Sequence, residues 1–233
     1  MLRSAVLIGL VALVPAACAR QSTPVTHAGR CVDCHAPHRT GAETCVSCHR
    51  GDAGAARAEL AHARLITGKA AEHRNPDSPA VVSGGRLVEM LSCRRCHRID
   101  GEGNRFATSL DHAVWQREQQ ALAASILTPV ETMPRFGLTA VQGEQVIAFL
   151  LNRSEPSAAQ PTYRVRFTAT GATNTLFGER CGGCHRAILR EGPAGEGTAG
   201  PNLSGLLTKH YPATAEGDRL WTSDALRDRL RNP

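Results

Sequence analysis

The sequence predicts an all-α protein in which small helical domains are joined in series behind a loop-rich N-terminal module. The 233 residues allow two to three small domains. The chain is poor in strand-like segments, and its clearest apolar periodicity is helical. Aromatic residues make up 4% of the chain and all nine lie at or after Phe106. Residues 20–79 therefore lack the side chains that usually dominate a small core, and must be disordered or built around something other than protein.

The cysteines form the most informative pattern in the chain. Eight of the nine are arranged in four Cys-x-x-Cys pairs, and His follows the second Cys every time. Only 10 of the 233 residues are His, so four such followers are far beyond chance. The four units contain the pairs Cys31 and Cys34, Cys45 and Cys48, Cys93 and Cys96, and Cys181 and Cys184, followed by His35, His49, His97 and His185. This is the attachment pattern of c-type haem.

The spacing suits covalent haem because two thiols three positions apart can reach both vinyl groups from one helical turn. The next residue, His, then supplies the proximal nitrogen to the iron. The sequence thus predicts four haem c groups, and a buried macrocycle would replace the core missing from residues 20–79. All-cysteine zinc sites would leave four histidines unexplained. A thioredoxin-like redox pair belongs near a βαβ pattern, and structural disulfides explain the histidines no better.

The first 19 residues are expected to form a signal peptide. Arg3 precedes an apolar run from Ala5 to Ala17, which is too short to span a bilayer that needs about 20 helical residues. Two interpretations of Cys18 stay open. Small residues around it suit ordinary cleavage after residue 19, while the stretch from Val14 to Cys18 resembles a bacterial lipobox, which implies that Cys18 is lipidated. Either way the chain is expected on the periplasmic side of the bacterial envelope, with a lipid anchor in the second case.

The first segment, residues 20–77, is expected to be a dihaem module. Its two attachment sites lie 14 residues apart and it contains no Met, so bis-histidine ligation and low potentials are expected. The segment holds four further histidines: His27, His38, His62 and His73. The stretch from residue 45 to residue 66 resembles compact multihaem cytochrome modules. That resemblance implies that His62 is the first candidate for a distal ligand, followed by His38 or His27.

The second segment, residues 78–155, is expected to contain three helices. The first covers residues 86–91 and has Leu87, Met90 and Leu91 on one face. The second covers residues 113–127 and stops before Pro129, because a residue ahead of proline avoids the helical region. The third begins with the capping-box spacing of Thr139 and Gln142 and ends near residue 153.

Helix, Cys-x-x-Cys-His, helix, Met-Pro-x-Phe and helix together resemble a class I cytochrome c domain. The resemblance implies that Met133, which lies 36 residues after His97, is the distal ligand of that haem, and that the site has a high potential. Met90 precedes the attachment site and is interpreted as a packing residue.

Residues 156–162 are rich in Pro, Ser and Ala and are expected to be a linker. The third segment, residues 163–233, contains Gly200-Pro-Asn-Leu-Ser-Gly-Leu206, which matches a run of class I cytochromes c. In that family the Pro carbonyl orients the proximal His, so Pro201 is expected to serve His185. The second segment has Leu110 as the nearest counterpart. The family's domain would continue past residue 233 to a Met, so this domain is expected to be truncated. The open alternatives are His210 as distal ligand or a five-coordinate iron.

The sequence therefore predicts a tetrahaem c-type cytochrome that carries single electrons and meets redox partner proteins. The formal net charge is +6, but the basic residues are scattered among acidic ones and haem propionates offset them, so no nucleic acid is expected. Two alternatives remain. One is a reductase or peroxidase with an open iron at His185, and the other is an electron-donating subunit of an envelope oxidoreductase.

Overall fold

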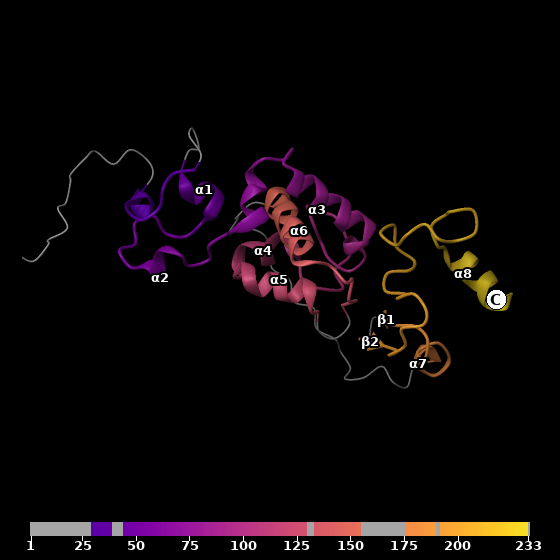
Figure 1. Cartoon of the computed structure of the whole chain (residues 1–233). Coiled ribbons are helices and arrows are strands. Elements are labelled where there is room, and N and C mark those ends of the chain that lie inside the picture. The colour runs from indigo at the N-terminus through magenta and orange to yellow at the C-terminus, as the bar shows by residue number, and fades with distance from the viewer. Residues whose placement is uncertain (1–28, 39–43, 130–132, 155–175, 190–191, 233) are drawn as a thin grey trace, which may run out of the picture.

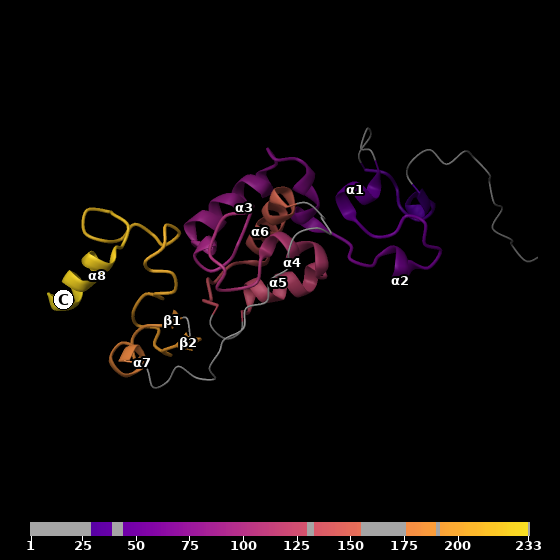
Figure 2. The same ribbon diagram turned by 180° about the vertical axis from the view of Figure 1, so that it is seen from behind.

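The computed structural model describes residues 29–38, 44–129, 133–154, 176–189 and 192–232. Helices dominate these ranges, and their only sheet is an antiparallel pair of two-residue strands, β1 (Ala187–Ile188) and β2 (Pro193–Ala194). The three segments follow one another along an elongated molecule (Figures 1 and 2). Within these ranges, no helix combines the length and apolar character that a membrane span requires.

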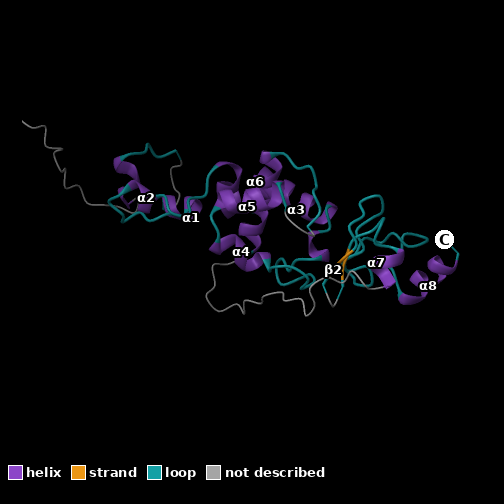
Figure 3. Cartoon of the chain, turned by 90° about the horizontal axis from the view of Figure 1, so that it is seen from below, coloured by secondary structure: helices purple, strands orange, loops and turns teal. Residues whose placement is uncertain are grey.

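The two longest helices of the described ranges, α3 and α6, both lie in the second segment (Figure 3). The first segment contains η1 (Gly29–Asp33), α1 (Cys45–His49), α2 (Ala58–Ala61) and η2 (Gly68–Arg74). The second contains α3 (Pro79–Met90), η3 (Cys93–Arg95), α4 (Leu110–Gln116), α5 (Gln119–Leu127) and α6 (Ala140–Arg153). The third contains α7 (Leu176–Arg180) and α8 (Ser223–Arg231). The all-α expectation is confirmed at this level.

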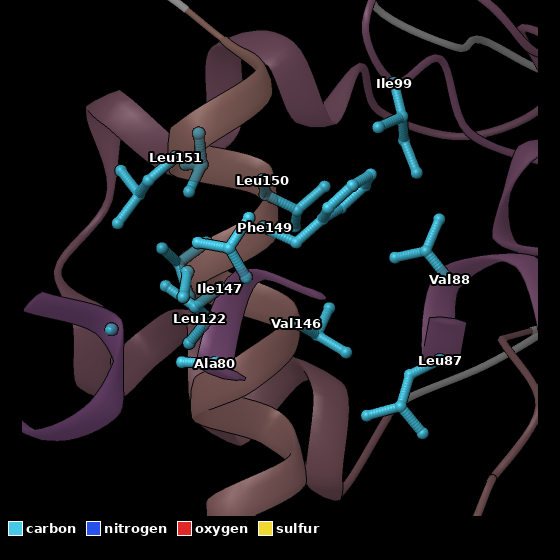
Figure 4. Packing of buried hydrophobic residues seen from close by; sticks show 14 of the residues in the cluster. Ala80, Leu87, Val88, Ile99, Leu122, Val146, Ile147, Phe149, Leu150 and Leu151 are labelled. Atoms are coloured by element: carbon cyan, nitrogen blue, oxygen red, sulfur yellow. The ribbon is translucent and has the colours of Figure 1, made fainter. Parts of the chain in front are cut away.

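The second segment has a hydrophobic core in which α3 and α6 cross and α4, α5 and η2 pack around them (Figure 4). The crossing is close at Gly84. A Cβ placed there would lie 1.9 Å from the carbonyl oxygen of Gln145, so the two backbones touch. The core includes Val81, Leu87, Val88, Ile99, Val114, Leu122, Val146, Ile147, Phe149, Leu150 and Leu151.

Helix α3 extends further towards the N-terminus than the sequence predicted. It begins after Ser78, whose side chain accepts a hydrogen bond from the backbone N–H of Val81. The buried face ends at Val88. Met90 lies beyond it in the last turn and is 70% exposed. The interpretation of Met90 as a packing residue is therefore wrong.

The predicted helix over residues 113–127 is two helices, α4 and α5, with extended backbone at Arg117 and Glu118 between them. The side chain of Gln119 exchanges hydrogen bonds with the backbone of Thr67, at 2.7 Å and 3.1 Å, which holds the start of α5 against the first segment. The predicted end before Pro129 is confirmed. The capping box of Thr139 and Gln142 and the end of α6 at Arg153 are confirmed as well.

The first segment has almost no protein core. Among the described residues from 31 to 65, none is buried. The buried residues that follow, Ile66 and Ala70, belong to the core of the second segment. The third segment buries a few side chains, among them Ile188 and Tyr211, and α8 contains no buried residue.

Candidate haem attachment sites

The four Cys-x-x-Cys-His units share one backbone conformation, a single helical turn. In the units that begin at Cys31, Cys93 and Cys181, the backbone N–H of the His donates to the carbonyl of the first Cys at 2.9 to 3.0 Å. In each of these the second Cys donates to the same carbonyl, at 3.1 to 3.3 Å. The remaining unit is itself the helix α1. The eight thiols are free. Each unit therefore presents two thiols and one imidazole from a single turn.

Three of the four histidines are oriented by a backbone carbonyl. His49 Nδ1 donates to Ile66 at 2.8 Å and His97 Nδ1 donates to Thr108 at 2.7 Å. A carbonyl can only accept, so the proton lies on Nδ1 and the lone pair lies on Nε2. A hydrogen bond from Nδ1 to a carbonyl, with Nε2 left free to bind, is the arrangement that metal-binding histidines typically have.

His185 Nδ1 donates to the carbonyl of Pro201 at 2.8 Å, so the contact expected from the class I resemblance is present. The second segment, which lacks that proline, uses Thr108, two residues before Leu110. His185 is also confined on one face by Gly200. A Cβ on Gly200 would lie 2.3 Å from the Cε1 atom of the His185 ring, so only glycine leaves room for the imidazole.

The unit at His97 is partly buried. Burial raises the pKa of the Cys93 thiol to about 11 and raises that of Cys96. Burial also lowers the pKa of His97, and the hydrogen bond to Thr108 opposes this in part. Within the described ranges, no three His, Cys, Asp or Glu side chains converge as ligands of a metal ion.

In the first segment the structure brings each attachment histidine next to a second histidine. His38 and His49 meet edge to face, with their Nε2 atoms 3.2 Å apart. The rings of His35 and His62 have centroids 5.9 Å apart at an angle of 53°. His38 and His62 are two of the three histidines that the sequence singled out as distal candidates. The third, His27, lies outside the described residues, as do Cys18 and the linker over residues 156–162.

The other two candidate ligands have different surroundings. Met133 is partly buried in the chain between α5 and α6, directly after residues that are not described. The side chain of His210 is 14% exposed, and its Nε2 lies 4.0 Å from a carboxylate oxygen of Glu102 in the second segment.

The roles of Ile66 and Thr108 could not be predicted from the sequence, since any residue type can offer a carbonyl. The role of Gly200 could have been inferred from its place beside Pro201.

No family model, curated protein or solved structure matches this chain. The assignment of the sites therefore depends on their own chemistry. The residues present fit covalently bound haem in three respects: paired thiols on one turn, imidazoles with Nδ1 already donated, and a first segment with no buried side chain among its described residues from 31 to 65.

Proposed function

We propose that the chain is a tetrahaem c-type cytochrome that transfers single electrons at the bacterial cell envelope. The observation that carries the proposal is the repeated site. A Cys-x-x-Cys-His turn with its imidazole oriented through Nδ1 by a backbone carbonyl occurs at His49, His97 and His185. The unit at His35 has the same turn. Disulfide chemistry does not require this orientation of the histidine, whereas a metal-binding imidazole does.

Haem iron supplies reversible one-electron chemistry, with a potential that depends on its axial ligands. In the proposal the eight cysteines form thioether bonds, and His35, His49, His97 and His185 bind iron through Nε2. The carbonyl partners fix the rotation of each ring and increase its basicity.

The distal ligands proposed for the first segment are His62 opposite His35 and His38 opposite His49. The two ring pairs support this assignment. Met133 is proposed as the distal ligand opposite His97. Bis-histidine sites have lower potentials than histidine–methionine sites, so we expect electrons to run downhill from the first segment to the second. Separate redox proteins would donate electrons to the haems and accept electrons from them.

The location at the envelope rests on residues 1–19 and on the need of c-type haem for maturation outside the cytoplasm. The lipobox interpretation makes Cys18 the membrane anchor. If it holds, Cys18→Ser expressed with the full leader will release the protein from the membrane fraction. Retention of the variant in that fraction would favour another means of attachment.

A redox titration of the matured protein, combined with a pyridine haemochrome count, tests the proposal. We expect four haems per chain with midpoint potentials spread between low and high values. Fewer haems, with the corresponding thiols free to react with a maleimide, would contradict it. Four equal potentials would remove the downhill gradient.

A second candidate function is a haem reductase or peroxidase with an open iron position at His185. It is favoured by the position of His210, whose Nε2 lies 4.0 Å from a carboxylate oxygen of Glu102 in the second segment. A carbon monoxide difference spectrum separates the two functions, because an iron with an open position binds carbon monoxide readily. Binding by one haem in four would favour the reductase, and binding by none would favour the carrier.

A further inference from the structure

The third segment contacts the haem attachment turn of the second segment through one loop, residues 201–211, which we call the docking loop. Arg95 lies between the two cysteines of the turn that ends at His97. Its guanidinium donates to the carbonyl of Asn202 at 3.2 Å and lies over the ring of Tyr211, 5.4 Å from the ring centroid. The Tyr211 hydroxyl donates to the same Asn202 carbonyl at 3.1 Å.

A second group of hydrogen bonds holds the same two elements together. The amide nitrogen of Asn104 donates to the carbonyl of Arg95 and to the hydroxyl of Thr208, both at 2.9 Å. Beside them, Lys209 pairs with Glu102 at 3.0 Å. The exposed ion pair contributes little, whereas hydrogen bonds from a charged, partly buried donor are among the stronger ones. Arg95 is therefore the residue on which the contact depends most.

Hydrogen bonds within the third segment also hold the docking loop in place. Ser204 is 0% exposed, and its hydroxyl accepts a hydrogen bond from the backbone N–H of Ile188 at 2.8 Å. Its backbone N–H donates to the Asn202 side chain at 2.9 Å. A displacement of Asn202 would thus be transmitted through the loop.

The contact between Arg95 and Asn202 lies next to the carbonyl group that orients His185. Asn202 follows Pro201, whose carbonyl accepts the hydrogen bond from His185 Nδ1 at 2.8 Å. Arg95 precedes Cys96 in the other attachment turn. Two hydrogen bonds, the Arg95 side chain and the backbone of Asn202 and Pro201 therefore connect the turn of His97 to the imidazole of His185.

We propose that Arg95 is a positioning residue that fixes the distance between the centres at His97 and His185 and provides the path for electron exchange between them. This rests on the proposed function. One electron passes from the reduced to the oxidised iron, and no bond forms or breaks. The third segment then exchanges electrons with the second through this contact, and the His97 centre joins the dihaem module to the His185 centre.

Arg94 offers a matched control, since it lies in the same Cys-x-x-Cys pair and its guanidinium is bound to Glu89 of α3 in its own segment. We would compare Arg95→Gln and Arg94→Gln in the full-length matured protein. The first readout is hydrogen exchange of residues 202–211 by mass spectrometry. We expect about tenfold or faster exchange in Arg95→Gln only, because a charged hydrogen bond between the elements is lost.

The second readout is the rate of electron exchange between the two centres after pulsed reduction. We expect Arg95→Gln to slow it with four haems still attached, Arg94→Gln to leave it unchanged, and Arg95→Lys to restore it in part, since lysine keeps a donor but loses the planar fork. Equal exchange rates in Arg95→Gln and wild type would overturn the inference. A wild-type protein without haem would overturn the proposed function instead, while the hydrogen-exchange contrast would still test the docking contact.

Discussion

The ring of His185 is confined on two sides, by a carbonyl that takes its Nδ1 proton and by a glycine that leaves it room. The carbonyl belongs to Pro201, and the neighbouring residue is Gly200. A hydrogen bond alone would allow the ring to pivot about the Nδ1–oxygen direction. Contact with the backbone of Gly200 removes that freedom, so the direction of Nε2 is fixed before any haem is attached.

We expect Gly200→Ala to displace the His185 ring and weaken its bond to iron, because the new methyl group would overlap the ring. Loss of a partner that orients a ligand typically costs tenfold or more in binding. The fraction of high-spin iron in the oxidised spectrum should rise by a comparable factor. Gly183→Ala in the same attachment turn is the control, since nothing lies within 4 Å of its Cβ position. Identical spectra of the two variants would contradict this account.

His73 is a buried titratable residue outside the proposed sites. It is 2% exposed, its Nδ1 donates to the carbonyl of Ala70 at 3.1 Å, and its ring packs edge to face on Trp115. Its Nε2 has no hydrogen-bond partner among the residues that the structure describes. Burial is the main cause that lowers the pKa of His73. The charged or titratable groups that lower it further are Arg74, Arg50 and His49.

We expect the free energy of unfolding to fall as the pH falls below about 6.5, the pKa of His in an unfolded chain. Below this pH the His73 imidazole is protonated in the unfolded state but stays neutral in the folded state. The free energy of unfolding therefore falls on acidification, by at most about 1.4 kcal/mol per pH unit. Urea unfolding of the matured protein at several pH values measures the slope. His73→Gln should flatten it, whereas His112→Gln, at a partly exposed position on α4, should not. An unchanged slope in His73→Gln would show that other groups cause the pH dependence.

At the scale of residues, the sequence predicts roles that depend on side-chain chemistry and does not predict roles that depend on backbone groups. The attachment cysteines and histidines carry their chemistry in their side chains and spacing. Pro201 could be predicted because it belongs to a recognisable run. Thr108 and Ile66 act only through their carbonyls, which every residue has, so their roles depend on where the chain passes and not on residue type.

At the scale of elements, the core of the second segment depends on the crossing of α3 and α6. Gly84 allows the helices to touch, and the ring of Phe149 lies against Gly85. Burial of Ile147, Leu150 and Leu151 on α6 follows from this close approach. Apolar side chains packed at such a crossing provide most of the stability of short helices.

We expect Gly84→Ala to destabilise the second segment by about 1–3 kcal/mol or more, because its methyl group would meet the backbone of α6 and force the helices apart. This outweighs the gain in helix propensity of up to about 1 kcal/mol. Thermal unfolding followed by circular dichroism measures the difference. Arg86→Ala, on the exposed face of α3, should change the midpoint little. A Gly84→Ala protein as stable as the wild type would mean that the helices can separate without cost.

The same scale shows why one helix could be predicted and another could not. The start of α6 is encoded locally, since Thr139 and Gln142 satisfy each other's backbone groups. The break between α4 and α5 depends on Gln119 and its hydrogen bonds to Thr67, 52 residues earlier in the chain. No periodicity within residues 110–127 contains that information.

At the scale of the whole molecule, the three segments differ in what holds them together. The second has a continuous hydrophobic core. The first is joined to it by His49, which exchanges hydrogen bonds with the backbone of Ile66, and by Arg50, which donates to the carbonyl of Trp115 at 2.7 Å. None of the described residues from 31 to 65 is buried, so the proposed haems would have to provide the burial that stabilises this part.

We expect haem loss to unfold the first segment and spare the second. In Cys45→Ala/Cys48→Ala, residues 44–65 should exchange amide hydrogens at least about tenfold faster, while α3 and α6 keep their protection, because local opening follows local burial. Hydrogen exchange of the full-length protein measures both regions in one sample. Cys181→Ala/Cys184→Ala is the control, since it removes a haem from the far end and should leave residues 44–65 unchanged. If residues 44–65 stayed protected without their haem, protein contacts would stabilise the first segment, and the expectation would be wrong. We therefore expect haem attachment and folding to be coupled most strongly in the first segment, where residues 20–79 contain no aromatic residue to build a core.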